Sequence, residues 1–292
     1  MSEISNIINE PIGDRMKRFE AKYDFKIEPQ NYFCVRLDGN KFSNFTRKFE
    51  KPYDVRFSQA MVMTTIDTIN KFGARTGFTQ SDEITLIFDK AIPDDFKKHI
   101  TYNHLFNGRV SKLLSIVSSY VSVRFNHHFR LLTSNLTNIY SQETLELING
   151  GTAIFDARIL EFDENNKYEM LNHLIWRSVK DCYRNAVQTY AHHIFGPAKI
   201  KYLNREQMIQ LIEENTNIVW SNIPLWQKYG VIIKKQLIKT DNVKNSVITS
   251  SFKVFSLKLS YNDTMLKFLF DKYFELDKIS EYQLEDYPLS II

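Results

Sequence analysis

This 292-residue chain lacks the features that mark several common protein classes. Its only cysteines are Cys34 and Cys182, too few for the disulfide framework of a small secreted domain. No apolar run is long enough to cross a bilayer, and the first twenty residues are too acidic and polar for a secretory signal. We therefore expect a reducing, cytoplasmic setting with no membrane partner, and an organellar location stays open.

The sequence also contains no Walker-type glycine loop, no repeat and no linker that divides it into independent domains. Its composition, 43% hydrophobic and 25% charged, is that of a globular protein with a sizeable core. We predict a single unit with a core over about residues 31–160 and an extension over about 161–292.

Acidic residues are absent from Phe96 to Gln142. The basic residues of this stretch are Lys97, Lys98, Arg109, Lys112, Arg124 and Arg130. A region of one charge sign suggests a polyanionic partner, either nucleic acid or nucleotide phosphates. A helix with ordinary solvated lysines is the alternative explanation.

Hydrophobic patterning predicts a strand, a helix, two strands, a helix and a strand, in that order. These elements cover residues 31–38, 55–72 behind a cap at Asp54, 75–79, 84–88, 102–125 and 152–155. The βαββαβ order predicts an α+β fold with a ferredoxin-like core, which polymerase palm domains and nucleotide cyclases share. Outside it we predict helices over 14–23, 168–195 and 204–214 and strands over 230–238 and 251–257.

In this topology the first and third strands are antiparallel neighbours, so Asp38 should lie close to Asp82 and Glu83. Paired carboxylates can hold two divalent cations, and magnesium prefers carboxylate, water and phosphate oxygens. Gly39 would let the backbone approach a metal or a phosphate. A solvated strand end beside an ordinary turn explains the same residues without a metal.

Several segments resemble the tRNA-His guanylyltransferase superfamily, whose members polymerise nucleotides in the 3′-to-5′ direction on tRNA 5′ ends. The matching segments, in order, are VRLDGNKFSNFTRKFEKPYD (35–54), TQSDE (79–83), GRVSKLLSIVSSYVSVRF (108–125), FDAR (155–158) and NIPLWQKYGVIIKK (222–235). Together they cover most of the chain, and it is their order that makes the resemblance specific.

The resemblance implies roles for individual residues. Asp38, Asp82 and Glu83 would be catalytic, and two Mg²⁺ ions would be bound by Asp38, Asp82 and the Gly39 carbonyl. The nucleotide site would comprise Asp38, Gly39, Asn40, Lys41, Phe42, Ser43, Lys51, Asp54, Ser81, Asp82 and Lys112. One position departs from the family motif K-P-N-D, because Tyr53 stands where the motif has asparagine.

Residues 176–190, WRSVKDCYRNAVQTY, resemble the bacterial-type, guanylyltransferase-like branch rather than the eukaryotic HINNLYN motif. The candidate RNA-binding residues are Asp181, Arg184 and Asn185 here, together with Lys97, Lys98, Arg109, Arg124 and Arg130. Helical spacing also allows Asp181 and Arg184 to form a structural ion pair. We predict core positions, not base-stacking positions, for Trp176, Trp220 and Trp226.

The branch implies a magnesium-dependent nucleotidyltransferase that repairs truncated tRNA 5′ ends against a template. Its substrates would be ATP, GTP and other nucleoside triphosphates. Its partner would be tRNA, read by the 161–292 extension, and the assembly would be a homo-oligomer, a tetramer by family resemblance. Three alternatives remain: guanosine addition to tRNA-His, a palm-fold nucleotide cyclase, and a non-catalytic tRNA-binding protein.

Overall fold

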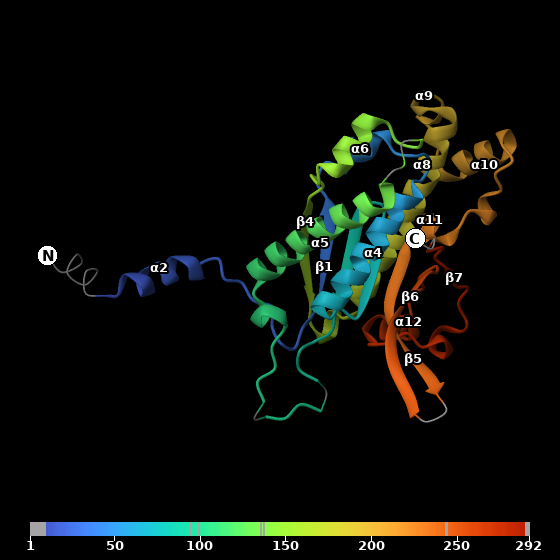
Figure 1. Ribbon diagram of the computed structural model, residues 1–292. Helices are drawn as coiled ribbons and strands as arrows, with labels where there is room; N and C mark the ends of the chain where they lie inside the picture. Colours follow the sequence, from blue (N-terminus) through green and yellow to red (C-terminus); the bar gives the residue numbers. More distant parts are fainter. Residues whose placement is uncertain are drawn as a thin grey trace.

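The computed structural model describes residues 10–93, 95–98, 100–134, 136, 138–242 and 245–289. Within them a seven-stranded antiparallel sheet runs in the order β4-β1-β3-β2-β5-β6-β7 (Figure 1). The strands are β1 (Tyr32–Gly39), β2 (Thr76–Gln80), β3 (Glu83–Phe88), β4 (Phe155–Phe162), β5 (Val231–Asn242), β6 (Asn245–Ser256) and β7 (Glu285–Asp286). The first four strands have the order of a ferredoxin-like sheet, so the predicted α+β core is confirmed.

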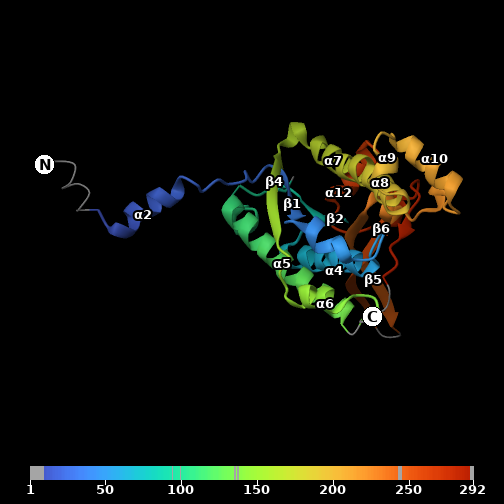
Figure 2. The same ribbon diagram turned by 90° about the horizontal axis from the view of Figure 1, so that it is seen from above.

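Two layers of helices cover the sheet (Figure 2). One face packs on α4 (Val55–Phe72) and α5 (Val110–Thr133), and the other on α7 (Tyr168–Ile175) and α12 (Asp263–Phe270). Because both faces are covered, the side chains of β2 and β3 are all buried. The remaining α-helices are α2 (Ile12–Ala21), α3 (Phe42–Phe45), α6 (Gln142–Asn149), α8 (Tyr183–Phe195), α9 (Pro197–Ile200), α10 (Arg205–Asn215) and α11 (Leu225–Tyr229). Short 3₁₀ turns cover 46–48, 105–108, 164–166, 220–222 and 276–279.

Local capping explains where several helices begin and end. The Asp54 carboxylate accepts from the backbone N–H groups of Arg56 and Phe57, and Gly73 ends α4 in a left-handed conformation. Asn204 forms a capping box with Gln207 at the start of α10. The Asp54 cap lies where the sequence predicts it.

Two of the predicted core elements have the wrong bounds. The helix predicted over 102–125 begins only at Val110, because Phe106, Asn107 and Gly108 have positive φ and form a separate 3₁₀ turn. It then continues to Thr133, since His128, Phe129 and Thr133 keep one side of its last two turns buried. The strand predicted over 152–155 is instead β4, which starts at Phe155, where pairing with Gly39 of β1 begins.

The segment from Tyr168 to Phe195 is one continuous helical rod, as predicted, but its middle is not α-helical. Residues Trp176–Cys182 form a π-helix, labelled η4, between α7 and α8. Such π turns are rare and recur at functional sites. Strand β5 pairs with β2, so the strands after residue 161 extend the same sheet as the predicted core.

Helix α2 stands apart from the rest of the molecule (Figures 1 and 2), and none of its residues is buried. Within the described residues, no helix combines the length and the apolar character that a membrane crossing requires.

The C-terminal end of α12 depends on a buried lysine from β5. Lys234 is fully buried, and its Nζ donates to the carbonyl oxygens of Phe268 and Asp271, both at 2.7 Å, and to the Thr76 hydroxyl at 2.8 Å. The amine thus satisfies helix-end carbonyls that have no partner within the helix.

We expect Lys234→Met to lower the free energy of unfolding by about 3 kcal/mol, because it leaves buried acceptors without a donor. Urea denaturation measures this loss. Lys235→Met, at the half-buried neighbouring position, is the matched control and should change stability by about 0.5 kcal/mol at most. Equal midpoints for the two variants would show that the amine does not hold the helix end.

Candidate active site at the end of the first strand

Carboxylates gather where β1 ends. Antiparallel pairing sets Asp38 opposite Glu83 of β3 on one side and Asp156 of β4 on the other. Asp82 lies in the two-residue turn between β2 and β3, and its carbonyl accepts from the Gly39 N–H at 3.1 Å. The predicted proximity of Asp38, Gly39, Asp82 and Glu83 is therefore confirmed, while their roles remain predictions.

The carboxylates of Asp38 and Asp82 lie in an environment that disfavours two bare charges. Burial raises the pKa of Asp38, and the nearby negative charge of Glu83 raises it further. Burial likewise raises the pKa of Asp82, and the negative charge of Asp38 adds to this effect. A divalent cation between the two carboxylates would remove this penalty.

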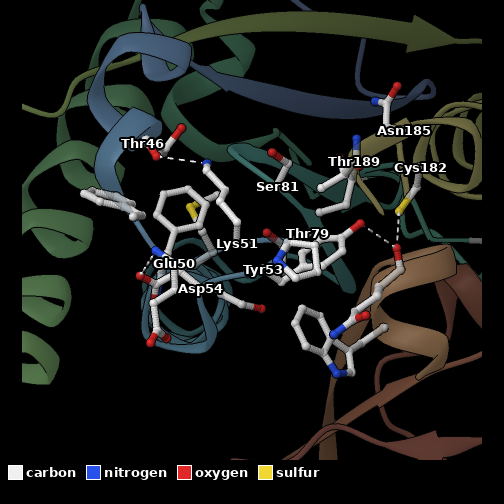
Figure 3. Close-up of a pocket in the computed structure, with 18 of the residues that line it drawn as sticks. Thr46, Glu50, Lys51, Tyr53, Asp54, Thr79, Ser81, Cys182, Asn185 and Thr189 are labelled. Atoms are coloured by element: carbon white, nitrogen blue, oxygen red, sulfur yellow. Dashed lines mark hydrogen bonds between the residues drawn. The ribbon is translucent and has the colours of Figure 1, made fainter. Parts of the chain in front are cut away.

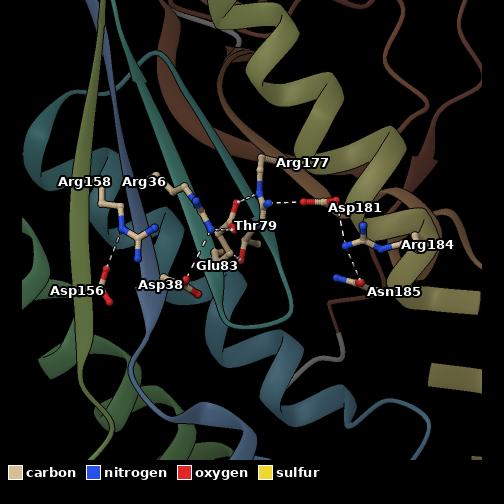
Figure 4. Close-up of polar contacts among 10 residues, drawn as sticks. All are labelled: Arg36, Asp38, Thr79, Glu83, Asp156, Arg158, Arg177, Asp181, Arg184 and Asn185. Atoms are coloured by element: carbon tan, nitrogen blue, oxygen red, sulfur yellow. Dashed lines mark hydrogen bonds and ion pairs between the residues drawn. The ribbon is translucent and has the colours of Figure 1, made fainter. Parts of the chain in front are cut away.

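Glu83 is held by two arginines. Its carboxylate is buried, forms an ion pair with Arg36 Nη2 at 2.9 Å and accepts a hydrogen bond from Arg177 Nε at 2.8 Å (Figure 4). Arg177 makes a second contact with Glu83 and also pairs with Asp181. We infer that Glu83 positions the strand end, because its oxygens already bind cations of the protein.

The donor set suits magnesium better than a softer metal. Within the described part of the chain, no three His, Cys, Asp or Glu side chains are grouped to hold an ion. An ion at Asp38 and Asp82 would therefore need further oxygens from the backbone, from water or from substrate phosphates. Magnesium typically binds through one or two carboxylates, waters and phosphates, so these residues fit it.

Side-chain packing determines the conformation of the loop after β1. A Cβ on Gly39 would lie 2.4 Å from the Phe42 ring, which is buried against Phe125 and Phe155. Glycine is therefore required so that Phe42 can fold back. The Asn40 N–H donates to the Ile154 carbonyl, so this amide and that of Gly39 are not available to wrap a phosphate.

A cavity of about 270 Å³ opens beside the β2–β3 turn (Figure 3). Lys51, Asp54 and Ser81 line it, as predicted for a nucleotide site, together with Asn185 and Thr189 of α8. A shallower groove of about 730 Å³ adjoins it through three shared residues, Lys51, Asn185 and Thr189. Other residues that line the groove are Ser43, Arg47, Gln188, His192 and His193.

Two of the cavity residues serve the fold. The Asp54 carboxylate accepts from the hydroxyl of Tyr140 at 2.5 Å in addition to its two helix-capping bonds, so its oxygens are already occupied. Tyr53 packs on Trp226 and Tyr190, and its hydroxyl donates to the Gln227 carbonyl. A tyrosine thus stands in place of the asparagine of the family motif, and its ring forms part of the cavity wall.

Lys112 is not brought to this site. It lies in the first turn of α5, where the Val110 N–H donates to the Phe25 carbonyl, ahead of β1. Asp38 is at the other end of β1, roughly 20 Å along the strand. The exposed Lys41 is close to the site by sequence, in a left-handed conformation after the strand end.

The acid-free region is less positive in space than in sequence. Arg109 pairs with Asp24 at 2.7 Å, and Arg124 pairs with Asp67 at 2.6 Å. Segments distant in sequence thus supply acids that 96–142 lacks. Lys97, Lys98 and Arg130 are exposed, and their predicted contact with RNA stays a prediction.

Arg36 and Arg177 are not among the predicted site residues, although the sequence carries a signal for both. Arg36 precedes Asp38 by two residues on a strand, and therefore faces the same side of the sheet. Arg177 precedes Asp181 by four residues on a helix. Arg184 also pairs with Asp181, at 3.1 Å, so the structural ion pair is present.

Comparison with known proteins places the chain in a family. A family model described as tRNAHis guanylyltransferase matches residues 13–163, slightly more than half of the chain. The chain belongs to the tRNAHis guanylyltransferase family. The tRNA(His) guanylyltransferase of Debaryomyces hansenii is 27% identical over 175 residues, which are 58% of this chain and 57% of that relative. The alignment thus spans little more than half the length of that curated relative.

Solved structures from the family agree with the fold. A bacterial tRNA(His) guanylyltransferase (Thg1)-like protein in complex with ATP matches with a TM-score of 0.64 and 25% identity, over 82% of this chain and 92% of that one. The structure of such a protein in complex with GTP matches with a TM-score of 0.60 and 26% identity, over 83% of this chain and 91% of that one.

We expect Asp82→Asn to raise the thermal midpoint of the metal-free chain. The folded-state pKa of Asp82 is raised above its ordinary value, so ionisation destabilises the fold at any pH above that folded-state pKa. The neutral amide removes this cost. In thermal-shift measurements, Mg²⁺ should raise the midpoint of the wild type but not that of the variant.

Asp277→Asn, at an exposed position in the 3₁₀ turn over 276–279, is the matched control and should behave as the wild type with and without Mg²⁺. A magnesium shift that survives in Asp82→Asn would place the ion elsewhere.

Proposed function

We propose that the chain is a magnesium-dependent nucleotidyltransferase that adds nucleotides to tRNA 5′ ends in the 3′-to-5′ direction. The observation that supports this most is the Asp38–Asp82 pair at the end of β1. A cavity lined by Lys51 and Ser81, two residues predicted for the nucleotide site, lies beside it. A forward polymerase or a cyclase would share such a pair. The direction of synthesis and the RNA substrate therefore rest on family membership.

Different residues of the site would have different roles in the reaction. Asp38 and Asp82 would hold the ions, and the pairs of Glu83 with Arg36 and Arg177 fix the strand end beside which those carboxylates lie. When bound there, magnesium would supply Lewis-acid activation of the attacking group and charge stabilisation of the leaving group. Lys51 adds positive charge to the cavity wall, where a triphosphate would lie.

The reaction would proceed in two transfers. The 5′-monophosphate of the RNA first attacks the α-phosphate of ATP, which forms an adenylylated RNA end and releases pyrophosphate. The 3′-hydroxyl of the incoming nucleotide then attacks the 5′ phosphate and releases AMP. An RNA that already carries a 5′-triphosphate would skip the first transfer and release pyrophosphate in the second.

We propose templated repair of truncated 5′ ends as the biological reaction. Residues 176–188 carry the bacterial-type pattern, and Asp181, Arg184 and Asn185 of this pattern lie at the carboxylate network or the cavity. Addition of the extra guanosine to tRNA-His is the second candidate, supported by the name of the Debaryomyces hansenii relative. A homotetramer remains a proposal from family resemblance.

We expect purified protein with Mg²⁺, ATP and labelled nucleotides to restore the missing 5′ nucleotide of several truncated tRNAs. The base added should follow pairing with the opposite strand, so changing the template base should change the product. Mapping of the extended 5′ end measures this. Asp38→Asn and Asp82→Asn should lower the rate by orders of magnitude, because an amide cannot replace the charge that holds the ions.

Competition with full-length tRNA-His that lacks its extra guanosine separates the two candidates. A strong preference for that tRNA, lost when its anticodon is changed, would replace repair by guanosine addition. Formation of a cyclic nucleotide from a nucleoside triphosphate alone would instead refute the polymerase assignment.

A further inference from the structure

An exposed tryptophan begins the π-helix beside the carboxylate network. Trp220 and Trp226 are buried, as predicted, but 49% of Trp176 is exposed, so the core prediction is wrong for this residue. A large aromatic side chain gains most of its stabilising free energy when it is buried. Its exposure here, in a rare helical turn that lies against the candidate site, calls for a role outside the core.

The ring of Trp176 is held over a fixed cation. The guanidinium of Arg177 lies 4.9 Å from the ring centre. Arg177 is itself fixed by its bonds to Glu83 and its pair with Asp181, so it cannot move freely away. A ring held in this way loses little conformational freedom when a second flat group stacks on it.

Cations continue along the same side of the helical rod. Lys180 and Arg184 follow Trp176 at intervals of four residues, and both are exposed, Arg184 with 56% of its side chain. The row spans about two turns of the helical rod. Asp181 pairs with Arg184 at 3.1 Å, and Figure 4 shows Arg184 at the end of the network away from Asp38.

We propose that Trp176 is a stacking platform for a nucleobase of the RNA substrate, and that Lys180 and Arg184 bind the phosphates next to it. An aromatic platform combined with a cationic row is the usual means of binding a single strand without reading its sequence. The row favours a polynucleotide over a free nucleotide, because its cations lie along the helix rather than around one point. This inference rests on the proposed function, since it assumes an RNA substrate.

The test measures RNA binding apart from catalysis. Trp176→Ala should weaken binding of a 5′-truncated, 5′-monophosphorylated tRNA about tenfold in fluorescence anisotropy, since loss of one base stack costs about 1–3 kcal/mol. Trp176→Phe should keep most of the affinity, and affinity for ATP should stay the same in both variants. Tyr202→Ala, at a position that is 86% exposed, is the matched control and should bind as the wild type.

Two further readouts separate stacking from a structural effect. RNA should quench the tryptophan emission of the wild type but not that of Trp176→Phe, because the other two tryptophans are buried. Lys180→Ala should reduce the slope of log affinity against log salt concentration by the amount expected for the loss of about one phosphate contact.

Unchanged RNA affinity in Trp176→Ala would overturn the proposal. So would a loss of ATP affinity without a loss of RNA affinity, which would assign the ring to the free nucleotide. A loss of RNA binding that coincides with a change of mass in light scattering would assign the Trp176 ring to a contact between subunits. That result would also overturn the proposal of a stacking platform. A wild type that binds RNA through Trp176 but adds no nucleotide would refute the proposed function alone.

Discussion

The buried contact between Glu83 and its two arginines is the interaction on which the site depends. Glu83 comes from β3, Arg36 from β1 and Arg177 from the π-helix, so one carboxylate joins two strands to the helical layer. A buried carboxylate with no partner would be strongly unfavourable, and removal of both arginines should therefore disturb all three elements. The positions of Asp38 and Asp82 follow from this junction.

Charges alternate along the network that grows from it. Asp38, Arg36, Glu83, Arg177, Asp181 and Arg184 follow one another as acid and base in turn. At the end of the network nearest β1, Asp82 adds a second negative charge to that of Asp38. At the other end, the last group is the positively charged Arg184. The neighbouring His173 stays neutral, because burial and the charges of Arg36 and Arg177 lower its pKa to about 4. One end of the network thus attracts cations and the other attracts anions.

The sequence predicted the order of the core elements and the meeting of Asp38 with Asp82 and Glu83, because strand patterning and topology are regular. It could not predict that Phe42 determines the need for Gly39, since that contact depends on how three aromatic rings pack. Charge patterning over 96–142 could not show that Arg109 and Arg124 form ion pairs, because Asp24 and Asp67 reach them only in the fold. The exposure of Trp176 depends on a π turn, for which helical periodicity gives no signal.

The π-helix between α7 and α8 also fixes the rotational phase of everything that follows it. Bonds in a π-helix join residues five apart rather than four, so inserting or deleting a residue in Trp176–Cys182 would change the angle through which α8 is turned relative to α7. Asn185 and Thr189 would then leave the cavity wall, although both side chains would still be present in the chain. The length of this segment, as much as its composition, is therefore under constraint, and point substitutions here should be tolerated better than single-residue insertions or deletions.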